Sequence, residues 1–333
     1  MDVLFLGAPE LEGLLPIADC VAPVREALAD LASGSATAPL RGRLAPARAA
    51  GTLLTMPAFL ERGGVLGVKV LAVVPAPSGG SGTYNGGLLL RFDGATGHMQ
   101  CIMDAGAITK IRTAATSVAA TEALARADSR VATVLGGGQQ AEAHAVGMAT
   151  LNGVSEIRLW DRSSERARQL ESHLSARLPS RLRLSVWPSV VDALDGCDIL
   201  CTTTRAQTPI VRGHDLPTGI HGNAVGAASP GARELDAEAF AVSQLFADRR
   251  ESLEQEADEF RLAIQEGAIT PDHVLGEIGE VFAGRVPGRL GPTDRTRFKS
   301  VGVAVEDLAA ARTAFLRAQE QGLGTLLRSD AME

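Results

Sequence analysis

A glycine-rich turn, GGGQQA at residues 136–141, constrains the fold of this chain more than any other feature. It directly follows the apolar run 131–135 and directly precedes a helical pattern, which is the context that the G-x-G-x-x-A fingerprint requires. The first glycine permits the tight turn, the third lets a phosphate approach the backbone, and the alanine lets the helix pack closely on the strand. The helix N-terminus then faces the pyrophosphate of a dinucleotide. The predicted cofactor-binding residues here are Gly136, Gly138, Gln139, Gln140 and Ala141.

Short apolar runs alternate with amphipathic segments from residue 130 onward. This spacing is typical of βαβ units, whose right-handed crossovers build a parallel sheet. We therefore predict an α/β fold for this region, with a Rossmann-type doubly wound parallel sheet. The expected strands are RVATVL, EIRLW, LSVW, DILCTTT, HGNAVGA and QLFAD, with helices beginning at Gln139 and Ser164 and another over 190–194.

The N-terminal part has a different pattern, which favours helices beside an antiparallel sheet. Apolar residues at helical spacing predict a helix over 17–33 that ends before Gly34. The strand-like runs are 51–56, 64–75 and 86–103, the last divided by a hairpin turn, with a Gly/Ser-rich loop over 76–86. Further helices are expected over 114–127 and 303–320, and the last of these could pack back onto this first region.

An acidic residue ends the second strand of the alternating region. This residue, Asp161, lies 25 positions after Gly136. A carboxylate there binds the ribose hydroxyls of NAD and would repel the 2′-phosphate of NADP, so NAD(H) is the favoured cofactor. Arg162 and Ser163 follow directly and could bind that phosphate instead, which leaves NADP(H) as the alternative.

Composition excludes several classes of function. The net charge of −7 leaves no basic stripe for phosphates, so we expect no nucleic-acid partner. No run approaches the ~18 apolar residues of a membrane span, and no Lys or Arg precedes Arg25, so we expect no membrane segment, no secretory leader and a cytoplasmic location. The four cysteines are too scattered for a disulfide framework, and the six histidines lack metal-ligand spacing, so no metal is expected.

Lysine is scarce, with three lysines against 29 arginines. A compact ammonium can lose its proton in a tight pocket and a guanidinium cannot, so a retained lysine is a candidate for a position that arginine cannot fill. Chance survival on the surface is the alternative. Lys69 lies within VLGVKVLAVV, a run too apolar for a casual surface position, whereas Lys110 is expected to be solvated, as is the acidic stretch 251–259.

Seven segments then point to one family. They are LR at 40–41, GVK at 67–69, TKIRTAA at 109–115, LGGGQQA at 135–141, NAVGA at 223–227, RELD at 233–236, and FKSVG with VED at 298–302 and 305–307. In this order, over nearly the whole chain, they resemble the ornithine cyclodeaminase/μ-crystallin family. The resemblance implies a homodimer in which residues 1–115 and 303–333 form an α+β substrate-binding and dimerisation domain. An NAD(P)-binding Rossmann domain, 116–302, is inserted in it.

The resemblance also implies the site residues. In the family, a lysine at the position of Lys69 lies at the reacting carbon, and arginines matching Arg41 and Arg112 hold the substrate carboxylate. A lysine can exchange a proton with an imine nitrogen, and arginine pairs with carboxylates in a bidentate way. Arg43 could replace Arg41 in this role. The substrate side chain would be bound near Met56, Tyr84 and Asn85.

Further cofactor contacts are expected at the carboxyl edge of the parallel sheet. Thr203 and Thr204 end the strand DILCTTT at this edge, where cofactors sit, although threonine is also common in strands for its β-propensity. The segments NAVGA and KSVG, which carry the family resemblance, add Val225, Gly226, Ser300 and Gly302.

One departure from the family bears on the reaction. True ornithine cyclodeaminases carry an acid/base Asp after the VG of this segment, and the matching residue here is Ala228, which cannot exchange a proton. Ser229 could orient the substrate nitrogen, or it could be an ordinary turn residue. Reduction of an imine needs hydride delivery, a carboxylate clamp and one proton source. We therefore predict an NAD(P)H-dependent reductase of a 2-imino acid or cyclic ketimine carboxylate, with a cyclodeaminase or a non-catalytic crystallin-like binding protein as alternatives.

Overall fold

The structure is a computed structural model that describes residues 2–46, 51–75, 83–228 and 230–328. The chain divides into two compact units: unit 1 comprises residues 1–113 and 303–333, and unit 2 comprises residues 114–302. The chain passes from unit 1 to unit 2 inside a single helix, α3 (Ala105–Leu124), and returns just before α11 (Ala304–Gln321). Each unit has its own eight-stranded sheet.

The sheet of unit 1 is a mostly antiparallel meander. Its strand order is β16-β1-β7-β6-β5-β4-β2, with β3 also paired to β4, and the pairing of β1 with β7 is parallel. The strands are β1 (Asp2–Leu6), β2 (Ala36–Thr37), β3 (Gly42–Leu44), β4 (Thr52–Leu60), β5 (Val65–Pro75), β6 (Thr83–Asp93), β7 (Met99–Asp104) and β16 (Thr325–Arg328).

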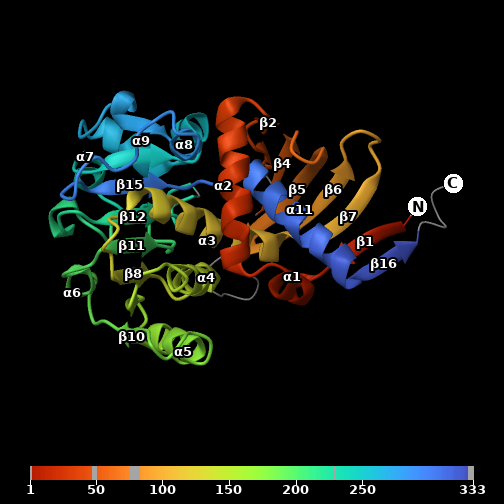
Figure 1. Cartoon of the computed structure of the whole chain (residues 1–333). Coiled ribbons are helices and arrows are strands. Elements are labelled where there is room, and N and C mark those ends of the chain that lie inside the picture. Colours follow the sequence, from red (N-terminus) through yellow and green to blue (C-terminus); the bar gives the residue numbers. More distant parts are fainter. Residues whose placement is uncertain (1, 47–50, 76–82, 229, 329–333) are drawn as a thin grey trace. The chain divides into compact units, whose positions relative to one another are not determined.

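Helices cover one face of this sheet. Helix α11 packs on α2 (Ile17–Ser33) and on β4 and β5, and α1 (Ala8–Leu14) packs against α11 (Figure 1). The approach of α11 to β5 is close at Gly67, where a Cβ atom would lie 3.3 Å from the Leu308 side chain and 2.6 Å from the Leu90 carbonyl oxygen. Helix α2 ends at Gly34, whose φ of 81° lies in the left-handed region that glycine adopts without strain.

The two faces of the unit 1 sheet differ in their surroundings. Met56, Lys69, Leu89 and Met103 are paired in register across β4, β5, β6 and β7, and all four are buried. Because side chains alternate along a strand, neighbouring positions point to the other face. That face carries Leu53, Leu66 and Leu88, which are 39%, 42% and 43% exposed. The sheet is therefore apolar on its open face as well as on its covered face.

The sheet of unit 2 is entirely parallel, with the order β10-β9-β8-β11-β12-β15-β13-β14. The chain order reverses between β8 and β11, which is the topological switch point of a Rossmann-type sheet. This confirms the predicted fold class. The strands are β8 (Val131–Leu135), β9 (Glu156–Trp160), β10 (Arg183–Val186), β11 (Ile199–Thr202), β12 (His221–Ala224), β13 (Gln244–Ala247), β14 (Val274–Glu277) and β15 (Thr296–Lys299).

Short helices connect these strands, and several begin at a side-chain cap of the kind that polar residues provide. Ser163 caps α5, Ser189 caps α6 and Asp236 caps α7 by accepting a bond from a backbone N–H in the first turn. The helices are α4 (Gln139–Met148), α5 (Ser164–Ser175), α6 (Val190–Leu194), α7 (Ala237–Ala241), α8 (Arg250–Glu256), α9 (Asp258–Gln265) and α10 (Ile278–Phe282). Among the helices in the described ranges, none combines the length and the apolar character needed to cross a bilayer.

Three local expectations differ from the structure. Helix α3 begins nine residues before the expected start at 114, because the Asp104 side chain accepts a bond from the Ala107 N–H at 2.7 Å and caps the helix there. Residues 83–86, expected in a loop, belong to β6, while 76–82 lie outside the described residues. The acidic stretch 251–259 breaks at Ala257, and Glu259 is fully buried, so this stretch is not uniformly a solvated face.

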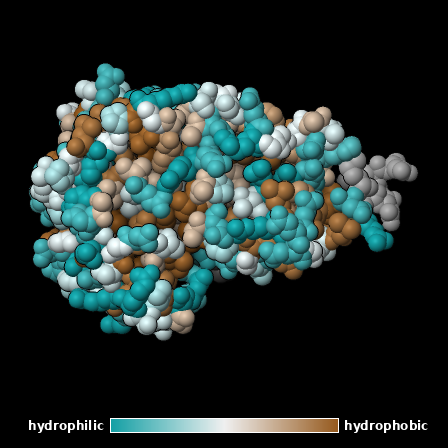
Figure 2. All heavy atoms as spheres, viewed as in Figure 1, coloured by the Kyte–Doolittle hydropathy of each residue, from teal (hydrophilic) through white to brown (hydrophobic). Residues whose placement is uncertain are grey.

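On the side of the molecule shown in Figure 2, hydrophilic side chains are interspersed with hydrophobic ones. A mixed surface of this kind needs no special explanation, since much of any folded protein's surface is apolar. The exposed leucines of the unit 1 sheet are more informative, because they share one face of one sheet.

Candidate functional site

A buried lysine lies at the centre of a charged cluster in unit 1. Lys69 projects from β5 toward the helix-covered face and is 1% exposed. Its Nζ lies 2.7 Å from the carboxylate of Asp307 on α11 and donates to the Thr109 hydroxyl on α3 at 3.2 Å. Lys69 is therefore fixed by two helices that arrive from distant parts of the sequence.

Burial changes the acidity of this ammonium. Desolvation lowers the pKa of Lys69 from 10.5 to about 8, and Arg112 and Arg41 act in the same direction, whereas Asp307 opposes the shift. A group with a pKa near the working pH is well suited to give up and take back a proton. Lys69 thus combines protection from bulk water with the acidity of a general acid or base.

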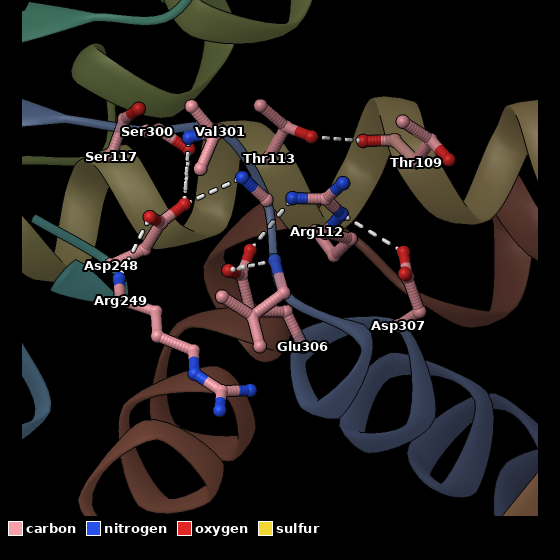
Figure 3. Close-up of polar contacts among 12 residues, drawn as sticks. Thr109, Arg112, Thr113, Ser117, Asp248, Arg249, Ser300, Val301, Glu306 and Asp307 are labelled. Carbon is pink, nitrogen blue, oxygen red and sulfur yellow. Dashed lines mark hydrogen bonds and ion pairs between the residues drawn. The ribbon is translucent and has the colours of Figure 1, made fainter. Parts of the chain in front are cut away.

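Arg112 is held in the same cluster by two adjacent carboxylates of α11. Its Nε donates to Asp307 Oδ1 at 2.9 Å, and its Nη1 donates to Glu306 Oε2 at 2.7 Å (Figure 3). Burial alone would raise the pKa of Asp307, but Lys69 and Arg112 together hold it below its ordinary value. Two cations and two carboxylates therefore balance each other, as buried charges require.

Glu306 also caps the start of α11, the helix on which it lies. Its Oε1 accepts the Val303 N–H at 3.0 Å, while Oε2 accepts from Arg112, so one carboxylate links the helix start to the cluster (Figure 3). Glu306 and Asp307 belong to the segment VED, which carries the family resemblance but predicts no role for either residue. The signal in the sequence is two adjacent acids in the first turn of an otherwise apolar helix, VAVEDLAAA. If such a helix is buried, these charges need partners.

The other predicted substrate residues lie in unit 1 at different depths. Met56 is buried on β4 directly opposite Lys69 in the strand register. Arg41 is half-buried, and its charge lowers the pKa of Lys69, whereas Arg43 is exposed on β3. Arg41 is thus the more buried of the two. Ser229 lies outside the described residues.

The predicted fingerprint of unit 2 has the local geometry of a phosphate-binding turn. Gly136 has a φ of 126°, and a Cβ there would lie 2.7 Å from the Thr203 hydroxyl, so only glycine fits. A Cβ on Gly138 would meet open space. Helix α4 begins at Gln139 with no side-chain cap on its first N–H groups. Those donors and the open approach over Gly138 fit a dinucleotide pyrophosphate.

Asp161 lies where a ribose-binding acid is expected. It follows β9, and a Cβ on Gly137 would lie 3.1 Å from its carboxylate, which places Asp161 beside the fingerprint. Its Oδ1 accepts the Ser163 N–H at 2.8 Å, which holds the side chain in place. Arg162 is exposed.

Two of the remaining cofactor candidates use their polar groups within the protein. The Thr203 hydroxyl donates to the Leu135 carbonyl at 2.8 Å, and both the N–H and the hydroxyl of Thr204 donate to Glu234. If Thr204 contacts a cofactor as predicted, its hydroxyl must therefore accept a hydrogen bond from the cofactor, or the contact must be purely apolar.

The segment that carries Ser300 and Gly302 is anchored by an acid that the sequence analysis missed. Asp248, at the carboxyl end of β13, accepts the Val301 N–H at 2.7 Å, the Gly302 N–H at 2.5 Å and the Ser300 hydroxyl at 3.5 Å (Figure 3). Val225 is buried, and the Gly226 N–H donates to Glu234 at 2.9 Å. The candidates at this edge are thus positioned by buried carboxylates.

Known proteins resemble the chain over almost its whole length. Δ1-pyrroline-2-carboxylate reductase from Bacillus cereus is 31% identical over 324 residues, which cover 97% of this chain and 98% of the relative. The structure of Δ1-pyrroline-2-carboxylate reductase from Thermococcus litoralis, in complex with NADH and L-proline, superposes with a TM-score of 0.90 at 32% identity, covering 97% and 99% of the two chains. An archaeal alanine dehydrogenase dimer with bound NAD also gives a TM-score of 0.90, at 30% identity and 99% and 100% coverage. The model of the ornithine cyclodeaminase/mu-crystallin family matches residues 1–322, and the chain belongs to this family.

Proposed function

We propose that this protein reduces the C=N bond of a 2-imino acid or a cyclic ketimine carboxylate to give an amino acid, with a nicotinamide cofactor as the reductant. The observation that carries this proposal is Lys69, a buried ammonium with a pKa of about 8 that pairs with Asp307, which in turn also pairs with Arg112. The Δ1-pyrroline-2-carboxylate reductases at 31% and 32% identity, whose substrate is a cyclic ketimine carboxylate, support it.

Reduction of an imine needs one hydride and one proton. The nicotinamide cofactor, when bound, supplies the hydride. Lys69 gives its Nζ proton to the imine nitrogen, so the new amine gains one N–H bond and Lys69 becomes neutral. Asp307 stabilises the protonated form of Lys69 before the transfer, and solvent protons restore it afterwards.

Arg41 and Arg112 bind the substrate carboxylate in this proposal. Glu306 and Asp307 hold the Arg112 guanidinium in place, so it is preorganised to meet a planar carboxylate. Met56, directly opposite Lys69, offers an apolar surface to the substrate side chain. It carries no charge that could bind a second ammonium group on the substrate.

The alternatives of the family each lack a supporting observation. A cyclodeaminase needs a second acid/base group, and Ala228, whose side chain is a methyl group, occupies the matching position. Burying a charged group is costly, and a non-catalytic binding protein would gain nothing from a buried lysine with a lowered pKa.

Unit 2 supplies the cofactor site in this proposal, and unit 1 supplies the substrate site and the dimer contact. We infer that NAD(H) is the preferred cofactor, because Asp161 lies beside the fingerprint and its charge opposes a 2′-phosphate. NADP(H) is the alternative, through the exposed Arg162.

The open face of the unit 1 sheet is the proposed contact with a second copy of the chain. Leu53, Leu66 and Leu88 lie exposed on this face, and exposed apolar side chains that share one face of a sheet commonly mark an interface. The 30% identical alanine dehydrogenase is a dimer, which supports a homodimer here.

The purified protein should consume reduced cofactor when it is given Δ1-pyrroline-2-carboxylate. We would follow nicotinamide absorbance with NADH and with NADPH against a panel of cyclic imino acids, and against 2-keto acids with ammonia or methylamine. L-Ornithine with NAD is the contrasting reaction. Stoichiometric cofactor loss on an imine supports the reductase. Formation of proline and ammonia from ornithine, without net cofactor change, would make the protein a cyclodeaminase.

A further inference from the structure

A buried carboxylate in unit 2 accepts five hydrogen bonds. Glu234 is fully buried in the loop before α7. Its Oε1 accepts the Thr204 N–H at 2.5 Å and the Thr204 hydroxyl at 2.7 Å, while Oε2 accepts the Thr202 hydroxyl at 2.7 Å. Oε2 also accepts the N–H groups of Gly226 and Ala227, at 2.9 and 3.2 Å. A carboxyl group with this many donors is held in one geometry.

The five donors come from the ends of two neighbouring strands. Thr202 and Thr204 lie at the carboxyl end of β11, and Gly226 and Ala227 lie just past the end of β12. The loops approach each other so closely that a Cβ on Gly226 would lie 2.1 Å from the Thr204 carbonyl oxygen and 2.5 Å from Glu234. Glu234 therefore sets the spacing between the two strand ends.

A second buried acid and a buried lysine support this arrangement. Glu259 accepts the backbone N–H groups of Glu234 and Leu235 at 2.9 and 3.2 Å, and it pairs with Lys299 at 3.0 Å. Lys299 donates to the Ala227 carbonyl at 2.9 Å. The loop after β12 is thus held through its N–H groups by Glu234 and through a carbonyl by Lys299.

The sheet order identifies what these strand ends face. The fingerprint follows β8 and Asp161 follows β9, so the pyrophosphate and the adenosine ribose belong at these two strand ends. A dinucleotide lies across the switch point, and its other half therefore extends over the ends of β11 and β12. Glu234 accepts hydrogen bonds from the residues at these two strand ends.

We propose that Glu234, supported by Glu259 and Lys299, is a positioning residue that shapes the surface on which the nicotinamide half of the cofactor binds. This inference rests on the nicotinamide cofactor of the proposed function. It assigns Glu234 no contact with the cofactor or substrate, and its effect passes through the loops after β11 and β12.

The test compares two ligands that differ only in the nicotinamide half. ADP-ribose reaches the fingerprint and Asp161 but has no nicotinamide, whereas NADH has both halves. In the Glu234→Gln variant, one acceptor oxygen becomes an NH₂ group that faces N–H donors, so the strand ends must separate. We expect calorimetry to give an NADH Kd raised about tenfold or more, the effect of losing a hydrogen bond to a charged group, and an unchanged ADP-ribose Kd.

The exposed Glu238→Gln variant, on α7, is the matched control and should bind both ligands as the wild type does. If Glu234→Gln does not fold, Thr202→Val removes a single buried hydroxyl donor to Glu234 and should give the same split with a smaller magnitude. An unchanged NADH Kd in these variants would overturn the proposal, and so would equal weakening of NADH and ADP-ribose, which indicates a general structural role. Binding is measured without an imine, so failure of the wild type to reduce imines would contradict the proposed function alone.

Discussion

The ammonium of Lys69 lies 2.7 Å from the carboxylate of Asp307, although 238 residues separate them in the chain. Strand β5 presents the lysine, and the first turn of α11 presents the aspartate, close to the point where the chain returns to unit 1. Burial lowers the pKa of the lysine and Asp307 raises it, so the pair sets the pH range in which Lys69 carries its proton.

Lys69→Met should abolish imine reduction and leave NADH binding intact. The loss of a general acid costs about 10²- to 10⁴-fold in rate, and we expect kcat to fall by this much. Lys110→Met is the matched control, since Lys110 pairs with Glu12 at the surface of unit 1. Turnover by Lys69→Met at the wild-type rate would rule out the proposed proton transfer.

The pH profile of kcat/KM should report the Lys69 pKa. Reduction needs the protonated lysine, so its rate should decline as the pH rises through about 8, and oxidation of the amino acid should show the opposite trend. Asp307→Asn removes the group that raises this pKa, so the decline should move to lower pH by about one unit or more. If Asp307→Asn left the pH profile unchanged, Asp307 would have no part in the acid/base step.

Arg41→Ala should raise the KM for the imino acid, by about ten- to a hundredfold, because a carboxylate loses a charge-assisted bidentate partner. Arg43→Ala is the control, two residues away and exposed on β3. We would measure both by steady-state kinetics at saturating cofactor. The reverse result, a large effect of Arg43 and none of Arg41, would reassign the carboxylate contact.

Asp161→Ser should weaken the preference for NADH over NADPH. Removing one negative charge beside the 2′-position should change the ratio of the two kcat/KM values by about tenfold. The exposed Asp272→Ser variant, which lies away from the fingerprint in the sequence, should leave the ratio unchanged. If Asp161→Ser kept the wild-type ratio of the two kcat/KM values, the 2′-position of the cofactor would not lie beside Asp161.

Leu66→Glu should convert the proposed dimer to a monomer, since it introduces a charge into the open apolar face of the unit 1 sheet. Light scattering after size-exclusion chromatography measures the change. Leu290→Glu is the control, because Leu290 is 71% exposed and lies in unit 2. A dimer that tolerates Leu66→Glu would place the contact on another surface.

The parts of the fold that depend on local sequence could be predicted. The fingerprint, the alternating strands of unit 2 and the helices α2 and α11 follow from periodicity and from glycine positions, which act over a few residues. The start of α3 was missed because a single side-chain cap at Asp104 extends the helix backward through a segment with no clear helical pattern.

The candidate site could be predicted only in part. Lys69 is predicted because lysine is scarce and this lysine lies within a run too apolar for a surface position, but nothing near it in the sequence indicates which residue pairs with it. Asp307, Glu234 and Glu259 are fixed by contacts between elements far apart in the chain. No pattern confined to neighbouring residues encodes such contacts, and Glu259 even lies in an acidic stretch that predicts exposure.

The balanced cluster of Lys69, Arg112, Glu306 and Asp307 has a consequence for the order of events in turnover. In the proposed function, a substrate carboxylate that binds beside Arg112 adds a negative charge near Lys69 and therefore raises the pKa of Lys69. Substrate arrival and proton uptake are then thermodynamically linked, each strengthening the other. In the proposed function, binding of the imino acid therefore favours the protonated form of the lysine that will give it a proton.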